Sequence, residues 1–289
     1  MTPFLLITIV AFRARPFFLT ASSSAVIVTR FLNVLIRAIL ILELSQDADA
    51  ADLRYYQGII DDALNREVSR PQRQTFILDP ASDIPSQSSC GNGSLMRCAP
   101  IPLVYHKNPA LAQQYAAEAS SPTHPHPTCQ QACQIYTHLI THILNNPTSS
   151  SKQNLWDILQ NFNNPKDDEP VAGGHVTPAL RDTLGRYKDL TSFVRTKEED
   201  IKSSGYVVHT LEAALWAFFT TETFKEGALK VVNLGDDADT VGAVYGGLAG
   251  AWYGVEALPE EWMRGVQAKG MLDGVVEGVV GLVERGGYM

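Results

Sequence analysis

Glycine recurs with a helical period near the C-terminus of this chain. Gly242, Gly246, Gly250 and Gly254 occupy every fourth position of an otherwise apolar segment, VGAVYGGLAGAWYG. On an α-helix this spacing places the glycines on one face. Each interior glycine costs a helix roughly 0.5–1 kcal/mol relative to alanine, so close packing of another helix along that face must offset the loss. The spacing therefore predicts a buried, central helix in an all-helical protein.

Three carboxylates and a hydroxyl immediately precede that segment. Asp236, Asp237 and Asp239 fall within four residues, and Thr240 follows them. Like charges this close repel, so the folded chain must expose the acids to water, protonate one of them or bind a cation. Such oxygen ligands suit magnesium, calcium or manganese better than zinc or copper. We therefore interpret the cluster as a site for a hard divalent cation; the alternative is that Asp239 or Thr240 caps the helix.

The remainder of the chain is predicted to be helices joined by polar, proline-rich connectors, because alternating strand patterns are scarce. Asn108 and Pro109 are typical of an N-cap and a first helical residue. Helical spacing and composition predict helices at 31–44, 110–119, 128–144, 208–218, 260–271 and 274–283. Residues 145–174 are predicted to be mostly connector and a rim of the substrate site. The fold class is therefore all-α, a compact single-domain helical bundle.

Composition narrows the classes of function. The chain has 289 residues, 45% of them apolar, and a formal net charge of −8 with no run of basic residues. This length and apolar fraction allow one large core, and the charge argues against a nucleic-acid-binding surface. Four cysteines are too few for a disulfide scaffold in a chain of this size. We expect reduced thiols, a cytoplasmic location, no nucleic-acid partner and a monomer.

The N-terminal segment is apolar over residues 3–12. That stretch is about half the roughly 20 residues of a membrane-spanning helix, and Arg13, Arg15 and Pro16 interrupt it. We therefore predict no membrane span. A secretory signal is the alternative, but the basic residues follow the apolar stretch instead of preceding it.

A glycine-rich segment, CGNGSLMRCAP, occupies residues 90–100. The glycines around Asn92 leave backbone N–H groups open to a phosphate or a sugar, with Arg97 near enough to assist. The alternative is an ordinary tight turn, which these residues also suit. His124 precedes a predicted helix and would either contact a ligand or cap that helix.

Four motifs occur in order along the chain. They are GNGSLMRCAP at 91–100, SSPTHPHPTCQQAC at 120–133, SSGYVVHTLEAALWAF at 203–218 and VNLGDDADTVGAVYGGLAGAWYG at 232–254. Together they resemble the ADP-ribosylglycohydrolase family, which includes ADP-ribosylarginine hydrolase, ADP-ribosylserine hydrolase and the dinitrogenase reductase-activating glycohydrolase. The resemblance covers most of the chain, from residue 91 to the C-terminus.

The resemblance implies a compact all-α fold around a site for two magnesium ions. It also implies hydrolysis of the glycosidic bond at ribose C1″ of ADP-ribose attached to a protein side chain or a related ADP-ribosyl compound, so ADP-ribose or an ADP-ribosylated protein is the expected partner. No catalytic residue is assigned by it. The implied metal ligands are Asp237, Asp239 and Thr240, with Asp236 as an adjacent acid. The implied substrate-binding residues are Gly91, Asn92, Gly93, Ser94, Met96, Arg97, His124, Ser204, Gly205 and Tyr206.

Two motifs of that family are not found in residues 1–90. They are a GDALG-like helix followed by Glu, and a Thr-Asp-Asp-Thr motif that supplies the other half of the metal ligands. We therefore divide the chain into an atypical segment at 1–50, replaced by sequence unrelated to the family, and a family-like helical domain at 51–289, with the clear match from about residue 91. One hypothesis is an active magnesium-dependent hydrolase. The alternative is a catalytically impaired or inactive member that binds ADP-ribose or has a structural role.

Overall fold

A computed structural model describes residues 90–121, 123–163, 176–265 and 269–284. The predicted helix at 31–44, the apolar stretch at 3–12 and the whole segment 1–50 lie outside these residues.

The described chain is helical, as the sequence predicted. Its residues form no β-strand apart from one isolated bridge. The helices are α4 (Pro100–Tyr105), α5 (Pro109–Ser120), α6 (Pro127–Asn145), α7 (Lys152–Asn163), α8 (Pro178–Leu184), α9 (Leu190–Val194), α10 (Val207–Thr220), α11 (Phe224–Asn233), α12 (Ala238–Tyr253), α13 (Glu260–Arg264) and α14 (Lys269–Glu284), with short 3₁₀ turns η3 (Glu198–Asp200) and η4 (Val255–Ala257).

Helices α5 and α6 begin as the sequence predicts. The side chain of Asn108 accepts a hydrogen bond from the backbone N–H of Leu111 at 3.2 Å, and Pro109 is the first residue of α5. Helix α6 packs against α5 on one side and against α10 and α12 on another. Because it lies between these helices, buried residues occur all round it between Thr128 and Ile143.

Helix α7 corrects the prediction of connector over residues 152–163; residues 164–174 of that predicted connector lie outside the described residues. Leu155, Trp156, Leu159 and Phe162 are buried on one face of α7. The ring of Trp156 stacks on that of Phe193 in α9, with their centroids 5.1 Å apart. Polar residues around the short apolar stretch concealed this helical face in the sequence.

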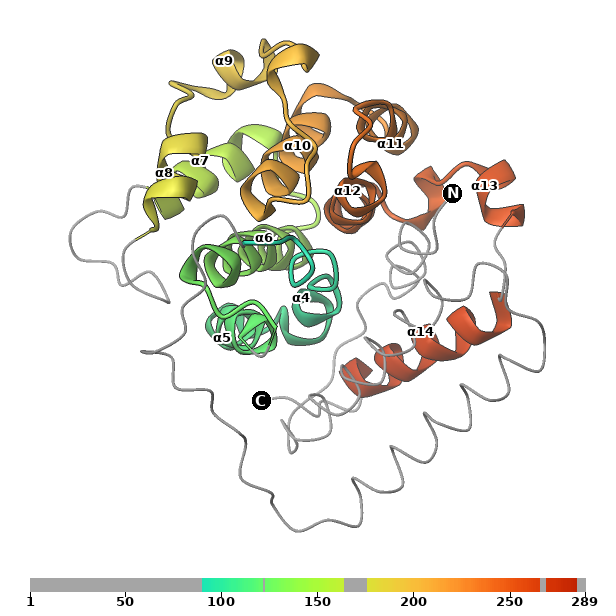
Figure 1. The fold of residues 1–289 in the computed structure, drawn as a ribbon. Coiled ribbons are helices and arrows are strands. Elements are labelled where there is room, and N and C mark those ends of the chain that lie inside the picture. The colour runs from blue at the N-terminus through green and yellow to red at the C-terminus, as the bar shows by residue number, and fades with distance from the viewer. Residues whose placement is uncertain (1–89, 122, 164–175, 266–268, 285–289) are drawn as a thin grey trace.

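Helices α10 and α12 form the centre of the bundle (Figure 1). Buried residues of α12 run without interruption from Thr240 to Gly250, and α12 contacts α6, α10 and α11. The hydroxyl of Tyr136 in α6 donates to the backbone carbonyl of Val244 at 3.1 Å. The prediction of a buried, central helix is therefore confirmed, but the predicted close approach of another helix is not found at Gly242, where an added methyl group would have its nearest neighbour, Val231 Cγ1, at 4.0 Å.

Gly254 departs from the predicted glycine face. Helix α12 ends at Tyr253, and Gly254 has a φ of 78°, a left-handed conformation that glycine adopts readily at helix ends. Gly254 therefore terminates the helix. Helix α11 instead carries a tightly packed glycine, Gly227, where an added methyl group would lie 2.6 Å from Cε2 of Tyr245 in α12.

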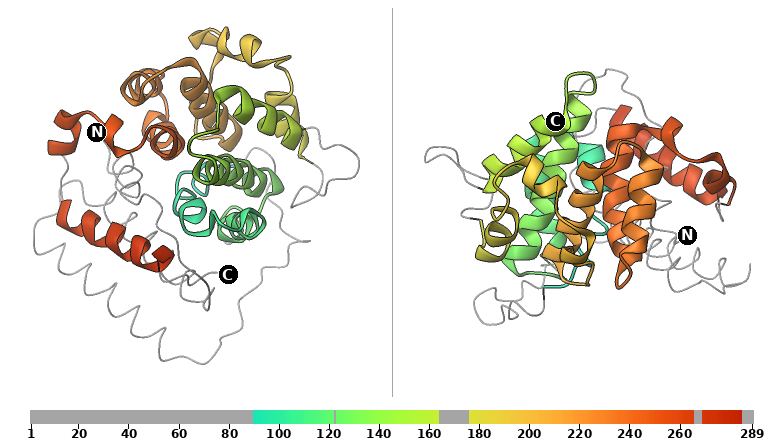
Figure 2. Two further views of the ribbon diagram at one scale, coloured as in Figure 1. Left: turned by 180° about the vertical axis from the view of Figure 1, so that it is seen from behind. Right: turned by 90° about the horizontal axis from the view of Figure 1, so that it is seen from above.

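The C-terminal helices differ in part from the prediction. Helix α13 ends at Arg264, and Gly265 donates its N–H to the carbonyl of Trp262 at 3.1 Å, so a single helix over 260–271 is wrong. The predicted helix at 274–283 lies within α14. Helix α14 contacts α4 and lies on the outside of the bundle (Figure 2). Among the helices that the structure describes, none is long and apolar enough to cross a membrane.

Candidate active site

The glycine-rich segment before α4 pairs with the segment before α10. The N–H of Asn92 donates to the carbonyl of Gly205 at 3.0 Å, and the N–H of Val207 donates to the carbonyl of Cys90 at 2.9 Å. These two hydrogen bonds flank an antiparallel bridge. Two of the four motifs are thereby held side by side at the N-terminal end of α10.

The turn between α11 and α12 carries the acidic cluster. Gly235 and Asp236 have φ values of 73° and 52°, in the left-handed region that glycine adopts freely and aspartate tolerates better than most residues. Ser203, which the sequence analysis did not single out, anchors this turn. Its hydroxyl donates to the carbonyl of Gly235 at 2.9 Å, and its carbonyl accepts the N–H of Asp237 at 3.0 Å. The N-terminus of α12 therefore lies beside the segment that precedes α10.

Asp237 occupies the N-cap position of α12 without capping the helix. An aspartate at this position ordinarily accepts a backbone N–H of the first turn, but Asp237 makes no such bond. Its Oδ2 accepts instead from Asn92 Nδ2 at 2.5 Å, and its Oδ1 accepts from the hydroxyl of Thr240 at 3.0 Å. The N-cap position is thus Asp237, but the Asp239 carboxylate accepts the first-turn N–H of Thr240 at 2.8 Å, so the alternative interpretation holds in part for Asp239.

The four residues of the acidic cluster differ in exposure. Thr240 is buried, with 7% of its surface exposed, and Asp237 is half-buried. Asp236 and Asp239 are exposed. Water around these two carboxylates weakens their repulsion of Asp237, which leaves Asp237 and Thr240 as the inward-facing pair.

Asp237 and Thr240 present two oxygen atoms at a spacing that suits magnesium. Octahedral magnesium holds its ligands at about 2.1 Å, so adjacent ligands lie about 3 Å apart. Asp237 Oδ1 and Thr240 Oγ1 are 3.0 Å apart and fit one edge of such an octahedron. Within the described ranges, no group of three or more His, Cys, Asp or Glu side chains is placed to hold a metal ion. The described residues therefore supply part of a ligand set.

His124, between α5 and α6, lies against the glycine-rich segment. A methyl group added to Gly93 would be 2.9 Å from Cε1 and 3.1 Å from Nε2 of His124, and one added to Gly91 would be 3.4 Å from Nε2. The imidazole therefore covers the two glycines. Burial, with the nearby charge of Arg97, lowers the pKa of His124, which favours the neutral ring.

Arg97 braces the glycine-rich segment through hydrogen bonds to neighbouring protein groups. Its Nη1 donates to the carbonyl of Gly93 at 3.1 Å, and its Nη2 donates to the carbonyl of Ala119 at 3.4 Å and to the hydroxyl of Thr123. Thr123 also bonds Nδ1 of His124 at 2.8 Å. Arg97 therefore ties the glycine-rich segment to the chain around His124.

The side chains of Ser94 and Met96 face inward. Ser94 is 3% exposed, and its hydroxyl accepts from the thiol of Cys133 at 3.6 Å. The sulfur of Met96 lies 3.9 Å from Oγ1 of Thr240. Met96 thus joins the glycine-rich segment to the first turn of α12. Cys90, Cys98, Cys129 and Cys133 are all buried, free thiols.

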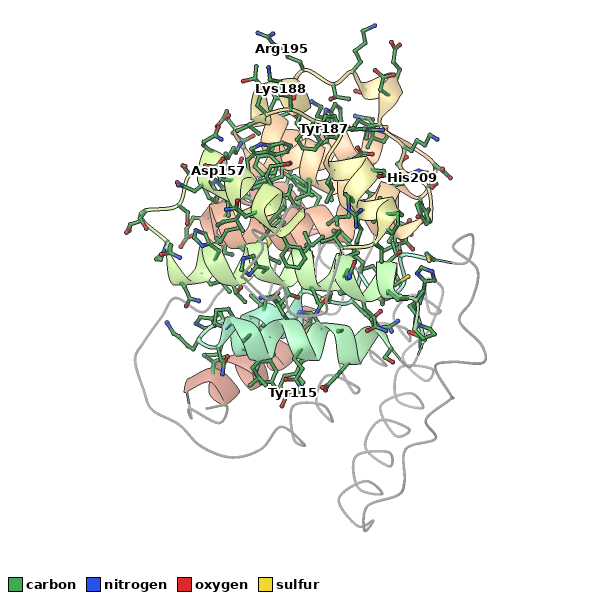
Figure 3. The ribbon with its side chains drawn as sticks, turned by 90° about the vertical axis from the view of Figure 1, so that its left-hand side faces the viewer. Tyr115, Asp157, Tyr187, Lys188, Arg195 and His209 are labelled. Carbon is green, nitrogen blue, oxygen red and sulfur yellow. The ribbon has the colours of Figure 1, made fainter. Side chains whose placement is uncertain are left out.

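The first turn of α10 adds two residues that the sequence analysis missed. The hydroxyl of Thr210 donates to the carbonyl of Ser204 at 3.1 Å and accepts from Asn92 Nδ2 at 2.8 Å. The hydroxyl of Ser204 lies 2.7 Å from Nδ1 of His209, which Figure 3 shows near the edge of the ribbon. Burial, with Lys202 nearby, lowers the pKa of His209. Side chains in a first helical turn point back toward the N-terminus of the helix. The predicted start of α10 could therefore have indicated that Thr210 and His209 lie near the site.

The comparisons with known proteins point in one direction. A sequence model of the ADP-ribosylglycohydrolase family matches residues 31–287. The ADP-ribosylarginine hydrolase Tri1 of Serratia proteamaculans is 32% identical over 179 residues, covering 61% of this chain and 42% of that protein. The ADP-ribosyl-[dinitrogen reductase] glycohydrolase of Rhodospirillum rubrum is 29% identical over 184 residues, covering 64% and 53% respectively.

Two further relatives extend this result. The human ADP-ribosylhydrolase ARH3 is 24% identical over 221 residues, covering 69% of this chain and 58% of that protein. A solved structure described as an ADP-ribosylglycohydrolase-related protein complex has a TM-score of 0.59 and 26% identity, covering 98% of this chain and 96% of that one. The chain spans about half the length of the three relatives matched by sequence. The family match over most of its residues shows that this chain belongs to the ADP-ribosylglycohydrolase family.

Proposed function

We propose that this protein is a magnesium-dependent hydrolase that cleaves the glycosidic bond at ribose C1″ of ADP-ribose attached to a protein side chain or a related ADP-ribosyl compound. Family membership supports the reaction class. Two relatives are named as hydrolases of ADP-ribosylarginine and of an ADP-ribosylated dinitrogen reductase. Both act, by name, on ADP-ribose joined to a larger molecule.

The orientation of Asp237 is the observation that carries the proposal. An aspartate that served only helix stability would bind the N–H groups of the first turn of α12. Asp237 is aimed instead at Asn92 and at the hydroxyl of Thr240. A half-buried carboxylate that does not bind the N–H groups of its own helix is available to a ligand.

The glycine-rich segment is proposed to bind the phosphates of ADP-ribose. Among the described residues, the backbone N–H groups of Gly93 and Ser94 have no hydrogen-bond partner, so they can donate to an anion. The absence of a side chain at Gly93 lets the His124 ring lie against the segment, where it would flank a bound phosphate. The segment 204–206, paired with this loop, is proposed to line the opposite side of the ligand.

Asp237 and Thr240, with the exposed Asp239, are the residues that would hold magnesium. When bound, magnesium would stabilise developing negative charge and lower the pKa of a bound water. Other residues of the chain hold the proposed metal-binding side chains in place: Asn92 donates a hydrogen bond to the Asp237 carboxylate, and Met96 contacts the hydroxyl of Thr240.

The test is release of ADP-ribose from arginine- and serine-ADP-ribosylated peptides, measured by chromatography with magnesium and with chelator. We expect magnesium-dependent release from at least one peptide. Asp237→Asn should reduce it by more than about 100-fold, because losing a ligand exceeds the 10- to 100-fold cost of losing an outer contact. Asp157→Asn is the matched control. Asp157 is exposed on α7 and, in Figure 3, lies on the opposite side of the ribbon from His209.

Absence of release from both peptides would contradict the hydrolase proposal. Calorimetry with ADP-ribose then decides the alternative function: binding without turnover identifies a catalytically impaired family member, and no binding removes both. The observation that favours a catalytically impaired protein is that the described residues supply only part of a metal-ligand set.

A further inference from the structure

Thr210 is fully buried, and its two neighbours determine which hydrogen bond its hydroxyl donates and which it accepts. Its exposed fraction is 0%. The hydroxyl has a single hydrogen, and the carbonyl of Ser204, 3.1 Å away, can only accept. The Thr210 oxygen must therefore accept from its other neighbour, Asn92 Nδ2, at 2.8 Å.

Because the Thr210 oxygen must accept this hydrogen bond, the orientation of the Asn92 side-chain amide is fixed. Asn92 is itself 8% exposed. Its two N–H groups point at Thr210 Oγ1 and, at 2.5 Å, at Asp237 Oδ2. A flipped amide would set its carbonyl oxygen against the Asp237 carboxylate and against a hydroxyl whose hydrogen is already committed. Only one orientation of the amide lets it donate to both Thr210 and Asp237.

Asp237 is the end of this chain of hydrogen bonds. Its Oδ2 is held by Asn92 and its Oδ1 by the hydroxyl of Thr240 at 3.0 Å, so the plane of the carboxylate is set from both sides. Asn92 belongs to the glycine-rich segment and Thr210 to α10, so the orientation of Asp237 depends on three separate parts of the chain.

We propose that Asn92 and Thr210 are positioning residues that preorganise the Asp237 carboxylate for a divalent cation. Both N–H groups of the Asn92 side chain are consumed in this task, so the phosphates of a ligand are left to the backbone N–H groups of the same segment. The proposal rests on the proposed function, because it assigns a purpose to the orientation of Asp237.

The test compares divalent-cation binding by Thr210→Val, Thr210→Ser and the native chain. Valine keeps the shape of threonine without its hydroxyl, whereas serine keeps the hydroxyl. Binding of Mn²⁺ is followed by electron paramagnetic resonance and of Mg²⁺ by calorimetry, with no substrate present. Loss of an outer hydrogen bond typically weakens metal binding by about 10- to 100-fold, and we expect that loss for Thr210→Val and recovery of native affinity for Thr210→Ser.

Asn92→Ala provides a second variant, because Asn92 lies in a loop and its change alters no residue within a helix. We expect it to weaken Mn²⁺ binding by a similar factor while circular dichroism and the melting temperature show a folded protein. A purely structural role would lower the melting temperature and leave the affinity of the folded protein unchanged, which would overturn the proposal.

This experiment distinguishes failure of the proposed function from failure of the positioning role. If the native chain binds neither Mn²⁺ nor Mg²⁺, the magnesium-dependent function is overturned and the positioning role with it. If the native chain binds them and both Thr210→Val and Asn92→Ala bind equally well, the positioning role alone is overturned.

Discussion

At the scale of single residues, the contact between Gly93 and His124 offers a direct test of the glycine-rich segment. A methyl group at Gly93 would lie 2.9 Å from Cε1 of the imidazole, closer than carbon atoms normally approach, so Gly93→Ala must displace the ring. His124 is half-buried and can swing outward at little cost to the fold. We expect Gly93→Ala to weaken ADP-ribose binding about tenfold, equivalent to ~1.4 kcal/mol, as measured by calorimetry.

A double-mutant cycle separates this clash from other effects of the added methyl group. In a His124→Ala background the ring is gone, so the further change Gly93→Ala should cost little more. The coupling between two residues in contact is then large. Strictly additive losses in the two variants would show that the His124 ring does not respond to Gly93.

Single residues also show where sequence reasoning reaches its limit. The acidic cluster and the glycines around Asn92 could be singled out, because charge repulsion and backbone freedom are properties of neighbouring residues. The hydrogen bond from Asn92 to Asp237 joins residues 145 positions apart, and no local pattern encodes it. The N-cap at Asp237 was equally hidden, since its carboxylate makes a tertiary contact in place of the local cap that the sequence favours.

At the scale of elements, helices marked by composition, by capping residues or by apolar spacing were predicted well. Helices α5, α6, α10 and α12 follow from capping residues and from apolar residues at helical spacing. Helix α7 was missed because polar residues surround its short apolar face, and the segment at 260–271 was predicted as one helix because its turn at Gly265 has no proline to mark it.

The packing of α11 on α12 gives a prediction at this scale. The ring of Tyr245 is fully buried, and its hydroxyl donates to the carbonyl of Phe224 at 3.0 Å, so it cannot move away from a methyl group at Gly227. Overpacking of this kind costs about 1–3 kcal/mol, and Gly227→Ala should lower the free energy of unfolding in urea by that amount.

Gly242→Ala is the matched control for that measurement. An added methyl group at Gly242 would have its nearest neighbour, Val231 Cγ1, at 4.0 Å, an ordinary contact. The substitution should be neutral or stabilise α12 by up to about 0.5–1 kcal/mol, since alanine favours helix over glycine. Equal losses at the two positions would contradict the packing described for α11 and α12.

At the scale of the whole molecule, the candidate site exists because distant segments converge at the N-terminal ends of α10 and α12. Backbone pairing joins the glycine-rich segment to the chain before α10, and Ser203 joins that chain to the acidic turn. Helical periodicity predicted the fold class but gave no relative positions for these segments. Their convergence was expected only through the resemblance to the ADP-ribosylglycohydrolase family, which the sequence match establishes.

The central claim is that these converging segments form a site for ADP-ribose and magnesium, in which Asp237 binds the magnesium ion. Calorimetric titration of ADP-ribose into the native chain and into Asp237→Ala, each with magnesium and with chelator, tests it most directly. We expect the native chain to bind ADP-ribose more tightly with magnesium than with chelator, and Asp237→Ala to show no such difference. Binding that is absent in the native chain, or that ignores magnesium in both proteins, would contradict it.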